Sequence, residues 1–581
     1  MKPTMALTLH TSRPVSLAIA ALLVTCAIAD TGMGQNPVSF PRLRDITSST
    51  GIHFAHSSSP ELRYIVESMS GGVALLDYDG DGWLDIYFTN APSVSMALAG
   101  KKARSALYRN NHDGTFTDVT EKAGIGYPCW AMGAAVADVT NDGRPDLLIS
   151  CFGGVVLYHN NGDGTFSDVT AKSGLSKDVG WATGAAFGDY DADGFPDLFV
   201  PHYVDLNLKS LPQFGSAQTC EYHGIPVQCG PRGLKGSPDT LYHNNGDGTF
   251  TDVAAQAGVA DANHYFGLGA VWTDLDNDGK LDLFVANDGE TNYLYRNLGN
   301  GRFTEIGSES GVAYSEDGVE QANMGIAVGD FERKGRMSIA VSHFSDEYMA
   351  LYRNEGGMNF TDVSHAAGIA HPTEPYVGWG DAFLDLNNSG WLDLILVNGH
   401  VYPQADDAKL GIHYREPKLV FLNAHDGTFR EVSKTVGDAL STPQVSRGLA
   451  VGDLFNRGAL DVVIENLTGE PQILSSIPDP ANHWISIQLE GAPRNRLALN
   501  TRVRVTVNGA SQLGEVRSGG SYLSQSDLRL HFGLGSSETI DALEVQWPGG
   551  LPQVFHNVAA NCFYHLKQGG TLKTLSVAPK P

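Results

Sequence analysis

The amino-acid sequence predicts an all-β fold, a seven-bladed β-propeller followed by a small antiparallel β-domain of the sandwich type. Three observations predict it: a nine-residue aspartate pattern recurs seven times, an aromatic pattern recurs in phase with it, and the last hundred residues form alternating strands without either pattern. The 581 residues include 67 glycines and are 42% hydrophobic. This composition is typical of a globular chain with many tight turns, not of a disordered or fibrous one.

The amino-terminal segment is predicted to be an export signal. Lys2 and Arg13 precede an apolar run over residues 15–28, which ends in small residues, as signal peptidase requires. About 14 apolar residues are too few to cross a bilayer, so a membrane anchor is the weaker alternative; lipidation at Cys26 is weaker still. We expect a signal peptide at residues 1–29 and a secreted or periplasmic protein without membrane insertion.

Two interlocked repeats predict the blades. The first, D-x-D-x-D-G-x-x-D, lies between two short apolar runs that indicate an antiparallel hairpin. The second, L-Y-x-N followed by a glycine turn and F-x-D-V, comes after it in six of the units. The copies of the first pattern begin at Asp77, Asp138, Asp189, Asp274, Asp330, Asp385 and Asp453.

The spacing of the repeats predicts a closed ring. The copies start roughly 63 residues apart on average, which fits a four-stranded blade with its loops better than a solenoid repeat. Residues 41–46 supply one further strand, so residues 36–475 make seven units. An array of β-sandwiches is the alternative, and closure favours the ring because a ring leaves no exposed sheet edges.

The two repeats resemble the FG-GAP/VCBS family of calcium-loop propellers. Further motifs at residues 495–505, 519–526, 530–535 and 545–550 (N-R-L-A-L-N-T-R-V-R-V, G-G-S-Y-L-S-Q-S, L-H-F-G-L-G and V-Q-W-P-G-G) resemble the ASPIC/UnbV domain. Together they resemble the secreted cartilage-acidic-protein-1-like family. Residues 499–501 depart from this family, which has a glycine-containing I-G-A turn there.

The second domain is predicted at residues 482–570 and is joined to the propeller through a linker at residues 471–480. The alternating runs at residues 503–507 and 542–545 predict its strands. Four residues match the family pattern, and we expect them to pack rather than bind: Arg517, Tyr522, Gln525 and Trp547.

The aspartate pattern predicts calcium loops. Calcium takes about six to eight oxygen ligands, and glycine at the sixth position permits the sharp turn that points alternating carboxylates inward. The first, third and fourth loops keep four carboxylates, the second replaces one by Thr140, and the sixth keeps only two. We therefore expect about five sites of decreasing affinity in that order.

In each predicted site the seventh loop residue donates its carbonyl and the others donate side chains. The predicted ligands are Asp77, Asp79, Asp81, Trp83 and Asp85; Asp138, Thr140, Asp142, Arg144 and Asp146; Asp189, Asp191, Asp193, Phe195 and Asp197; Asp274, Asp276, Asp278, Lys280 and Asp282; and Asp385, Asn387, Ser389, Trp391 and Asp393.

The two remaining loops are predicted to be free of metal. Lys334 and Arg457 occupy the fifth position there, where a cation would repel Ca²⁺ and fill the cage itself. The alternative for all seven loops is an Asx-rich turn that only caps a hairpin, and repetition in phase disfavours it. We expect the calcium to be structural, because unneutralised carboxylates this close together repel one another.

Five cysteines follow the predicted signal peptide. Cys220 and Cys229 enclose a short loop rich in glycine and proline, and we expect them to form a disulfide. Cys129 and Cys151 flank one predicted hairpin, where a disulfide and two buried free thiols are equally expected. Cys562 has no evident partner.

The face opposite the aspartate loops is the predicted ligand face, because the segments that enter the first strand and leave the second meet there. Aromatic rings together with polar groups would suit a glycan or protein ligand. Packing of these rings between blades is the favoured alternative, and a second metal site at the histidines has no supporting spacing. The candidates are Glu67, Trp130, Trp181, His202, Tyr203, His264, Tyr265, Asp288, Trp379, His400 and Tyr402.

The net charge of −26 excludes nucleic-acid binding, which needs clusters of Lys and Arg. No nucleophile elbow, Walker A loop, H-E-x-x-H helix or dinucleotide fingerprint is present in the sequence. The favoured hypothesis is therefore a calcium-binding extracellular recognition or adhesion module. The alternative is a carbohydrate-active hydrolase or lyase, with Glu67, Asp288, His202, His264 and His400 as loose acid/base candidates.

Overall fold

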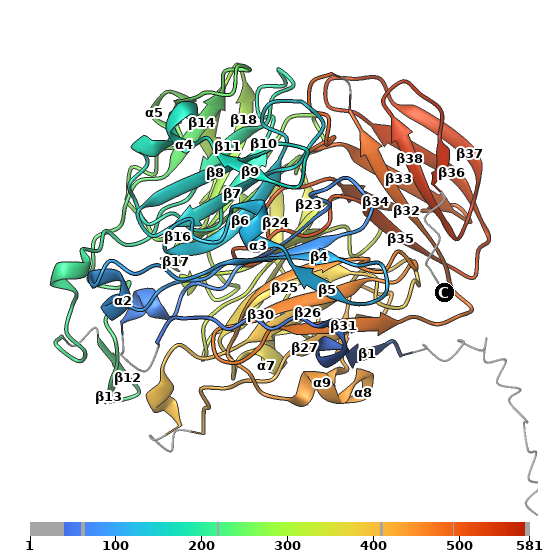
Figure 1. Cartoon of the computed structure of the whole chain (residues 1–581). Coiled ribbons are helices and arrows are strands. Elements are labelled where there is room, and N and C mark those ends of the chain that lie inside the picture. Colours follow the sequence, from blue (N-terminus) through green and yellow to red (C-terminus); the bar gives the residue numbers. More distant parts are fainter. Residues whose placement is uncertain (1–39, 60–63, 218–219, 407–410, 492, 576–581) are drawn as a thin grey trace, which may run out of the picture. The chain divides into compact units, whose positions relative to one another are not determined.

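Seven successive sheets, each with four antiparallel strands along its main path, build residues 42–477 (Figure 1). The computed structural model describes residues 40–59, 64–217, 220–406, 411–491 and 493–575. The predicted signal peptide, residues 1–29, lies outside the described residues.

The strands of the first six sheets follow in chain order, from blue towards orange in Figure 1. They are β2 (Val73–Leu76), β3 (Asp85–Phe88), β4 (Ala106–Asn110), β5 (Phe116–Asp118); β6 (Ala131–Ala137), β7 (Asp146–Cys151), β8 (Gly154–Asn160), β9 (Phe166–Asp168); β10 (Ala186–Gly188), β11 (Asp197–Val200), β14 (Thr240–Asn244), β15 (Phe250–Asp252); β16 (Gly267–Thr273), β17 (Asp282–Glu290), β18 (Tyr293–Gly299), β19 (Arg302–Glu305); β21 (Ile326–Gly329), β22 (Ser338–Val341), β23 (Ala350–Gly356), β24 (Asn359–Asp362); and β25 (Gly378–Leu384), β26 (Asp393–Asn398), β27 (Leu419–Asn423), β28 (Phe429–Glu431).

The helices are single turns, and most of them follow the fourth strand of a sheet. They are α1 (Thr47–Thr50), α2 (Val94–Leu98), α3 (Thr120–Ala123), α4 (Thr170–Ser173), α5 (Ala254–Ala257), α6 (Gly307–Ser310), α7 (Ala370–Thr373), α8 (Ser433–Val436) and α9 (Asp438–Ser441). Within the described residues, no helix has the length and apolar character needed to cross a membrane.

The seventh sheet joins the two ends of this region. It consists of β29 (Ser446–Gly452), β30 (Asp461–Asn466), β31 (Gln472–Ile477) and, as its outer strand, β1 (Arg42–Asp45). Arg42 lies opposite Ile477 and Asp45 opposite Leu474. The predicted linker at residues 471–480 is therefore wrong over most of its length, because the amino-terminal strand pairs with these residues and makes them part of the sheet.

The innermost strands contact one another in a closed cycle, β2, β6, β10, β16, β21, β25, β29 and back to β2. Most of the apolar core lies between neighbouring sheets; one cluster, for example, joins Val73 and Phe88 of the first sheet to Val463 and Ile473 of the last. The all-β propeller predicted from the repeats is thus confirmed. Burying both faces of each sheet against its neighbours explains the continuous apolar runs along the inner strands.

In each of the first six sheets, the asparagine of the L-Y-x-N pattern, or its equivalent, links the sheet to the preceding one in the ring. The Asn110 Nδ2 donates to the Leu454 carbonyl at 2.8 Å, and the Asn160 Nδ2 donates to the Tyr78 carbonyl at 2.8 Å. The equivalent bonds come from Asn244, Asn297, Asn354 and Asn423. The second repeat is thus the hydrogen-bonded joint between blades, which is why it recurs in phase with the aspartate loops.

The carboxy-terminal residues form two further four-stranded sheets, one of β35 (Leu530–Gly535), β32 (His483–Glu490), β38 (Cys562–Lys567) and β39 (Lys573–Leu575), the other of β34 (Ala510–Glu515), β33 (Arg502–Val507), β36 (Thr539–Gln546) and β37 (Gln553–Ala559). Apolar residues of both sheets share one core, as in a sandwich. One pair, β32 with β38, is parallel rather than antiparallel, because β38 returns to this sheet only after the chain has passed through β36 and β37 of the other.

The segment between β34 and β35 lies inside the ring of inner strands. We call residues 517–527 the axial segment. The Gln525 amide donates to the Val73 carbonyl at 2.9 Å, and the Gln525 carbonyl accepts from Leu75 at 2.9 Å. Ser521 and Ile326 exchange two backbone hydrogen bonds, of 2.7 and 3.1 Å.

Each inner strand contacts the axial segment or β34, the strand that precedes this segment in the chain. Further hydrogen bonds join Ala134 to Leu523, Asp381 to Ser521, Val451 to Ser526 and Thr273 to Glu515 of β34, and Gly519 lies against Ala186. At Gly72 a Cβ atom would lie 2.1 Å from the Leu523 carbonyl oxygen, so glycine is required there for the close approach.

The predicted Cys220–Cys229 disulfide is present. Cys129 and Cys151, for which the sequence left two alternatives, also form a disulfide. Cys562 is a free thiol on β38. The Cys220–Cys229 disulfide closes a small hairpin of β12 (Glu221–Tyr222) and β13 (Ile225–Pro226) within the insertion between β11 and β14.

Candidate metal loops and ligand pocket

The aspartate loops join the first strand of each blade to the second, and all seven share one backbone shape. The sixth residue is a glycine with positive φ in every loop, for example Gly82 at 85° and Gly194 at 91°. The fourth residue also has positive φ, for example Asn277 at 62° and Asn388 at 58°. These two left-handed positions curl the loop so that the carboxylates of alternate residues face inward.

Three loops bring carboxylate oxygens close enough together to hold one ion. These groups consist of three aspartates each, with ligand atoms within 4.8 Å of one another: Asp77, Asp79 and Asp85; Asp189, Asp191 and Asp197; and Asp274, Asp276 and Asp282. They belong to the three loops for which the sequence predicted four carboxylates. In the third loop, His243 also lies in such a group with Asp191 and Asp193.

The oxygens of these groups are only partly satisfied by the protein. The Asp189 Oδ1 and the Asp79 Oδ1 are buried without a hydrogen-bond partner in the described structure. Burial and the neighbouring carboxylates of Asp197, Asp193 and Asp191 raise the pKa of Asp189 to about 8. Hard oxygen donors that repel one another and lack partners fit a hard cation such as Ca²⁺.

The ninth residue of the loop has a second, structural role. The Asp85 side chain accepts hydrogen bonds from the Tyr78 amide at 3.2 Å and the Asn110 amide at 2.8 Å. Asp197 makes the same pair of bonds with Tyr190 and Asn244. Burial raises the pKa of Asp197 to about 7. This carboxylate therefore fixes the loop to the third strand as well as facing the cluster.

Cationic side chains lie beside several loops, a feature that the repeat pattern alone did not predict. Arg109 contacts Asp79 at 2.6 Å, and Arg296 contacts Asp276 at 2.8 Å. Arg502, from β33 of the carboxy-terminal sandwich, contacts Asp274 at 2.9 Å. The arginine of L-Y-R-N could have been noticed as a loop neighbour, whereas nothing local in the sequence indicates Arg502.

The other four loops differ in their contents. In the second loop Asp142 pairs with Arg144, and His159 contacts Asp146 at 2.9 Å. In the sixth loop, burial raises the pKa of Asp385 to about 6. In the fifth and seventh loops, the cations predicted to fill the cage pair with acids of the same loop, Lys334 with Glu332 at 2.9 Å and Arg457 with Asp461.

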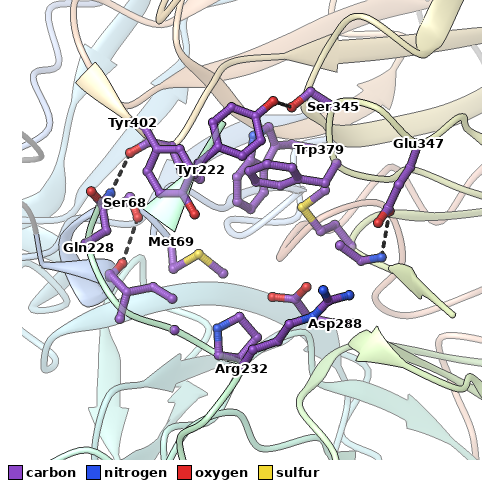
Figure 2. A pocket seen from close by; sticks show the side chains of 18 of the residues that line it. Ser68, Met69, Tyr222, Gln228, Arg232, Asp288, Ser345, Glu347, Trp379 and Tyr402 are labelled. Carbon is purple, nitrogen blue, oxygen red and sulfur yellow. Dashed lines mark hydrogen bonds between the residues drawn. The ribbon is translucent and has the colours of Figure 1, made fainter. Parts of the chain in front are cut away.

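A cavity of about 370 Å³ lies at the other end of the blade hairpins, where the inner strands begin and the second strands end. Its wall contains Met69 and Trp379 near the starts of inner strands, and Tyr203 and Asp288 at the ends of second strands. The disulfide-closed hairpin adds Tyr222. Figure 2 shows Tyr222 and Tyr402 across the cavity from Asp288 and Arg232, with Met69 between them.

Hydrogen bonds fix the wall of this cavity. The Tyr203 hydroxyl donates to the Asp288 Oδ2 at 2.5 Å, and the Glu347 Oε2 accepts from the Ala322 amide at 2.8 Å. The Tyr222 hydroxyl bonds the Ser345 hydroxyl at 2.7 Å, and the Gln228 Nε2 donates to the Val401 carbonyl at 2.6 Å. The insertion between β11 and β14 is thus tied to two other blades.

Four of the residues predicted on the ligand face line this cavity: Tyr203, Asp288, Trp379 and Tyr402. Three other predicted residues, Trp130, Trp181 and Glu67, are buried nearby. The two tryptophans belong to the same apolar cluster as Tyr203 and Trp379. Trp130 and Trp181 pack on either side of Phe152, with ring centroids 5.5 and 5.4 Å from it. The Glu67 side chain accepts from the amides of Ser59 and Val94.

The remaining predicted residues lie outside the cavity wall. His202 is buried against Asp178 at 2.9 Å, and Tyr265 stacks on Tyr293 with centroids 5.2 Å apart. His264 is exposed with φ of 57°, and His400 is buried behind Tyr402 and Tyr222.

Sequence reasoning missed several residues of the cavity wall, chiefly Arg232, Gln228, Met69, Phe344 and Glu347. Most come from loops between the repeated patterns, where no periodic signal marks a residue. The cysteine pair was the one usable signal, because it located the inserted hairpin that supplies Tyr222 and Gln228.

Comparisons with known proteins agree with this architecture. The family profile "FG-GAP-like repeat" matches residues 77–149, 138–200, 233–285 and 274–341, and "ASPIC and UnbV" matches residues 491–573. The fold and its aspartate loops therefore define an FG-GAP repeat propeller joined to an ASPIC/UnbV domain.

Relatives from several animals match most of the chain. Cartilage acidic protein 1 of Mus musculus is 24% identical over 497 residues, which cover 82% of this chain and 70% of that protein. The Homo sapiens protein of the same name is 23% identical over 516 residues, covering 84% and 70%. The chain is thus similar to cartilage acidic protein 1 along most of its length, and it carries FG-GAP-like repeats followed by an ASPIC/UnbV domain.

Among solved structures, an Agrocybe aegerita lectin described as recognising non-reducing terminal N-acetylglucosamine aligns with a TM-score of 0.38 and 16% identity, over 80% of this chain and 100% of the lectin. A TM-score this low supports no inference about the present chain.

Proposed function

We propose that this chain is a secreted recognition or adhesion module whose blades are stabilised by calcium, with its ligand face opposite the aspartate loops. The observation that carries the proposal is the convergence of three aspartates in each of the first, third and fourth loops. The loops at Asp138 and Asp385, with fewer carboxylates, would be weaker sites. The two disulfides suit an oxidising compartment outside the cytosol.

The calcium would act on stability. An ion that binds only the folded state adds about 2.7 kcal/mol at a hundredfold excess over its dissociation constant. In this chain it would replace the repulsion between loop carboxylates by attraction to a shared ion. The ligand face would then bind its target on a propeller whose aspartate loops, at the opposite end of the blades, are stabilised by calcium.

The test is calorimetric unfolding with millimolar Ca²⁺ and with EGTA. Asp191→Asn removes one carboxylate from the third loop, and we expect it to reduce the calcium-dependent rise in Tm. Asp247→Asn is the matched control, since Asp247 is fully exposed in the turn between strands three and four of the same blade and caps only that turn. An identical Tm with Ca²⁺ and EGTA would contradict the proposal.

The ligand face needs a separate measurement. Binding to glycan and matrix-protein arrays without turnover is the expected result. Turnover of a polysaccharide that is lost in Asp288→Ala would instead support the carbohydrate-active alternative.

A further inference from the structure

The cavity on the proposed ligand face has an unbalanced charge. Its wall carries the acids Glu221, Asp288, Asp346 and Glu347 and one base, Arg232. Of these acids, Asp346 contacts His223 at 2.6 Å. A cavity with such an excess of acids attracts cations and repels carboxylates and phosphates.

Two of the acids are partly withdrawn from water. Burial raises the pKa of Asp288 to about 6, and burial together with the nearby Asp288 raises the pKa of Glu347 to about 7. A bound cation would relieve both effects, because an opposite charge favours the ionised carboxylate. A neutral sugar would leave them in place.

Aromatic rings and two methionines form part of the remaining wall. The ring of Tyr222 lies 5.5 Å from that of Tyr402 and 5.8 Å from that of Phe344. Met69 and Met324 line the same cavity. Aromatic faces attract an alkylammonium group through the negative charge of their π face, and methionines can pack against its alkyl stem.

We propose that this cavity binds an alkylammonium group, with the carboxylates of Asp288 and Glu347 facing the charge and the rings of Tyr222 and Tyr402 covering the stem. This inference rests on the ligand face of the proposed function and names the chemistry that this face recognises. The group can belong to a lysine side chain of a partner protein or to a free amine.

The test is calorimetric titration of the full chain, loaded with calcium, at low salt. The probes are Nα-acetyl-lysine-N-methylamide for a peptide source, n-butylamine for a free amine, and the uncharged isostere Nα-acetyl-norleucine-N-methylamide. We expect an ammonium probe to bind, the norleucine compound not to bind, and affinity to fall as NaCl is raised from 0.05 to 0.5 M. Whichever ammonium probe binds more tightly identifies the source.

The variants separate charge from folding. Asp288→Asn and Glu347→Gln are each expected to weaken the ammonium probe at least tenfold. Glu309→Gln, an exposed acid on α6, is the control and should leave affinity unchanged. All three should keep the wild-type calcium-dependent Tm, which shows that they fold.

The inference is overturned if the norleucine compound binds as well as the lysine compound, or if folded Asp288→Asn and Glu347→Gln retain wild-type affinity. It is also overturned if inorganic phosphate or a chito-oligosaccharide binds in this cavity in preference to the amines. In that last case the proposed recognition function stands and only its ligand class is wrong. Failure of the proposed function would instead appear as an absence of any calcium effect on Tm.

Discussion

Single residues deep in the ring hold charge states that differ from those in water. His56 is buried, with its Nε2 3.0 Å from the Ser70 hydroxyl and its Nδ1 2.8 Å from the Ser58 hydroxyl. Ser70 donates to the Ala131 carbonyl, so its oxygen accepts from the Nε2–H and the Nδ1 accepts from Ser58. Burial, with a further contribution from Arg447, lowers the pKa of His56 to about 3.

This histidine should make the protein sensitive to acid. The unfolded chain binds a proton near pH 6.5, whereas the folded chain does so only near 3, so the stability contributed by neutral His56 is lost progressively as the pH falls below 6.5. At pH 5 the loss is about 2 kcal/mol. We expect His56→Gln to lose less stability than the wild type between pH 7 and 5 in urea titrations.

The charged groups facing His56 are Arg447 and Glu465, the latter 3.9 Å away. Burial raises the pKa of Glu465 well above its ordinary value, so the folded state takes up this proton first and gains stability as the pH falls. Glu465 is present in both proteins and cancels in the comparison. Parallel pH profiles of the two proteins would show that His56 is not the sensitive group.

At the scale of the element, the axial segment explains the glycine-rich inner strands. Leu523 is 1% exposed and lies against Gly72 and Gly133. Truncation of Leu523 to alanine would leave a cavity between the axial segment, the start of β2 and β6. We expect Leu523→Ala to cost about 2–5 kcal/mol of unfolding free energy, measured by urea denaturation.

The control for this substitution is Leu551→Ala, since Leu551 is 87% exposed and should change stability little. Equal effects of the two substitutions would mean that the axial segment is not packed in the ring in solution.

The disulfide-closed hairpin is a second element with a local role. Replacing Cys220 and Cys229 by serine removes a constraint worth about 2.5–3 kcal/mol of loop entropy. We expect faster amide exchange in residues 201–239 by hydrogen-exchange mass spectrometry and no change in the calcium-dependent Tm, because the aspartate loops lie at the opposite end of the blades. Cys562→Ser serves as the control; unchanged exchange in the double variant would contradict this role.

At the scale of the whole molecule, the axial segment and the adjoining strand β34 together couple the carboxy-terminal sandwich to every blade. Arg502, Arg529 and the backbone of Gly535 also bond the aspartate loops directly. The two predicted domains should therefore not unfold separately. We expect one calorimetric transition for the calcium-loaded chain, whereas two resolved transitions, one of them reported by Trp484 and Trp547 of the sandwich, would show independent domains.

The sequence predicted those parts of the molecule that repeat. The phase of L-Y-x-N with D-x-D-x-D-G-x-x-D indicated a ring, and the carboxylate count singled out the loops at Asp77, Asp189 and Asp274, which are the ones whose acids cluster. The axial segment could not be predicted, because Tyr522 and Gln525 match a family motif whose partner surface is formed by strands hundreds of residues away. The cavity wall could not be predicted for the same reason, because Glu347 and Arg232 are far apart in the sequence and become neighbours only when the ring has formed.

The pairing of β1 with β31 has a consequence for biosynthesis. Asp45 is 427 residues ahead of Gln472, the side chain it contacts in the same sheet. At ribosomal rates of about 5–20 residues per second, the first strand waits on the order of tens of seconds for its partner. The newborn chain thus carries β1 unpaired for most of its synthesis, and the ring can close only after β31 has been made.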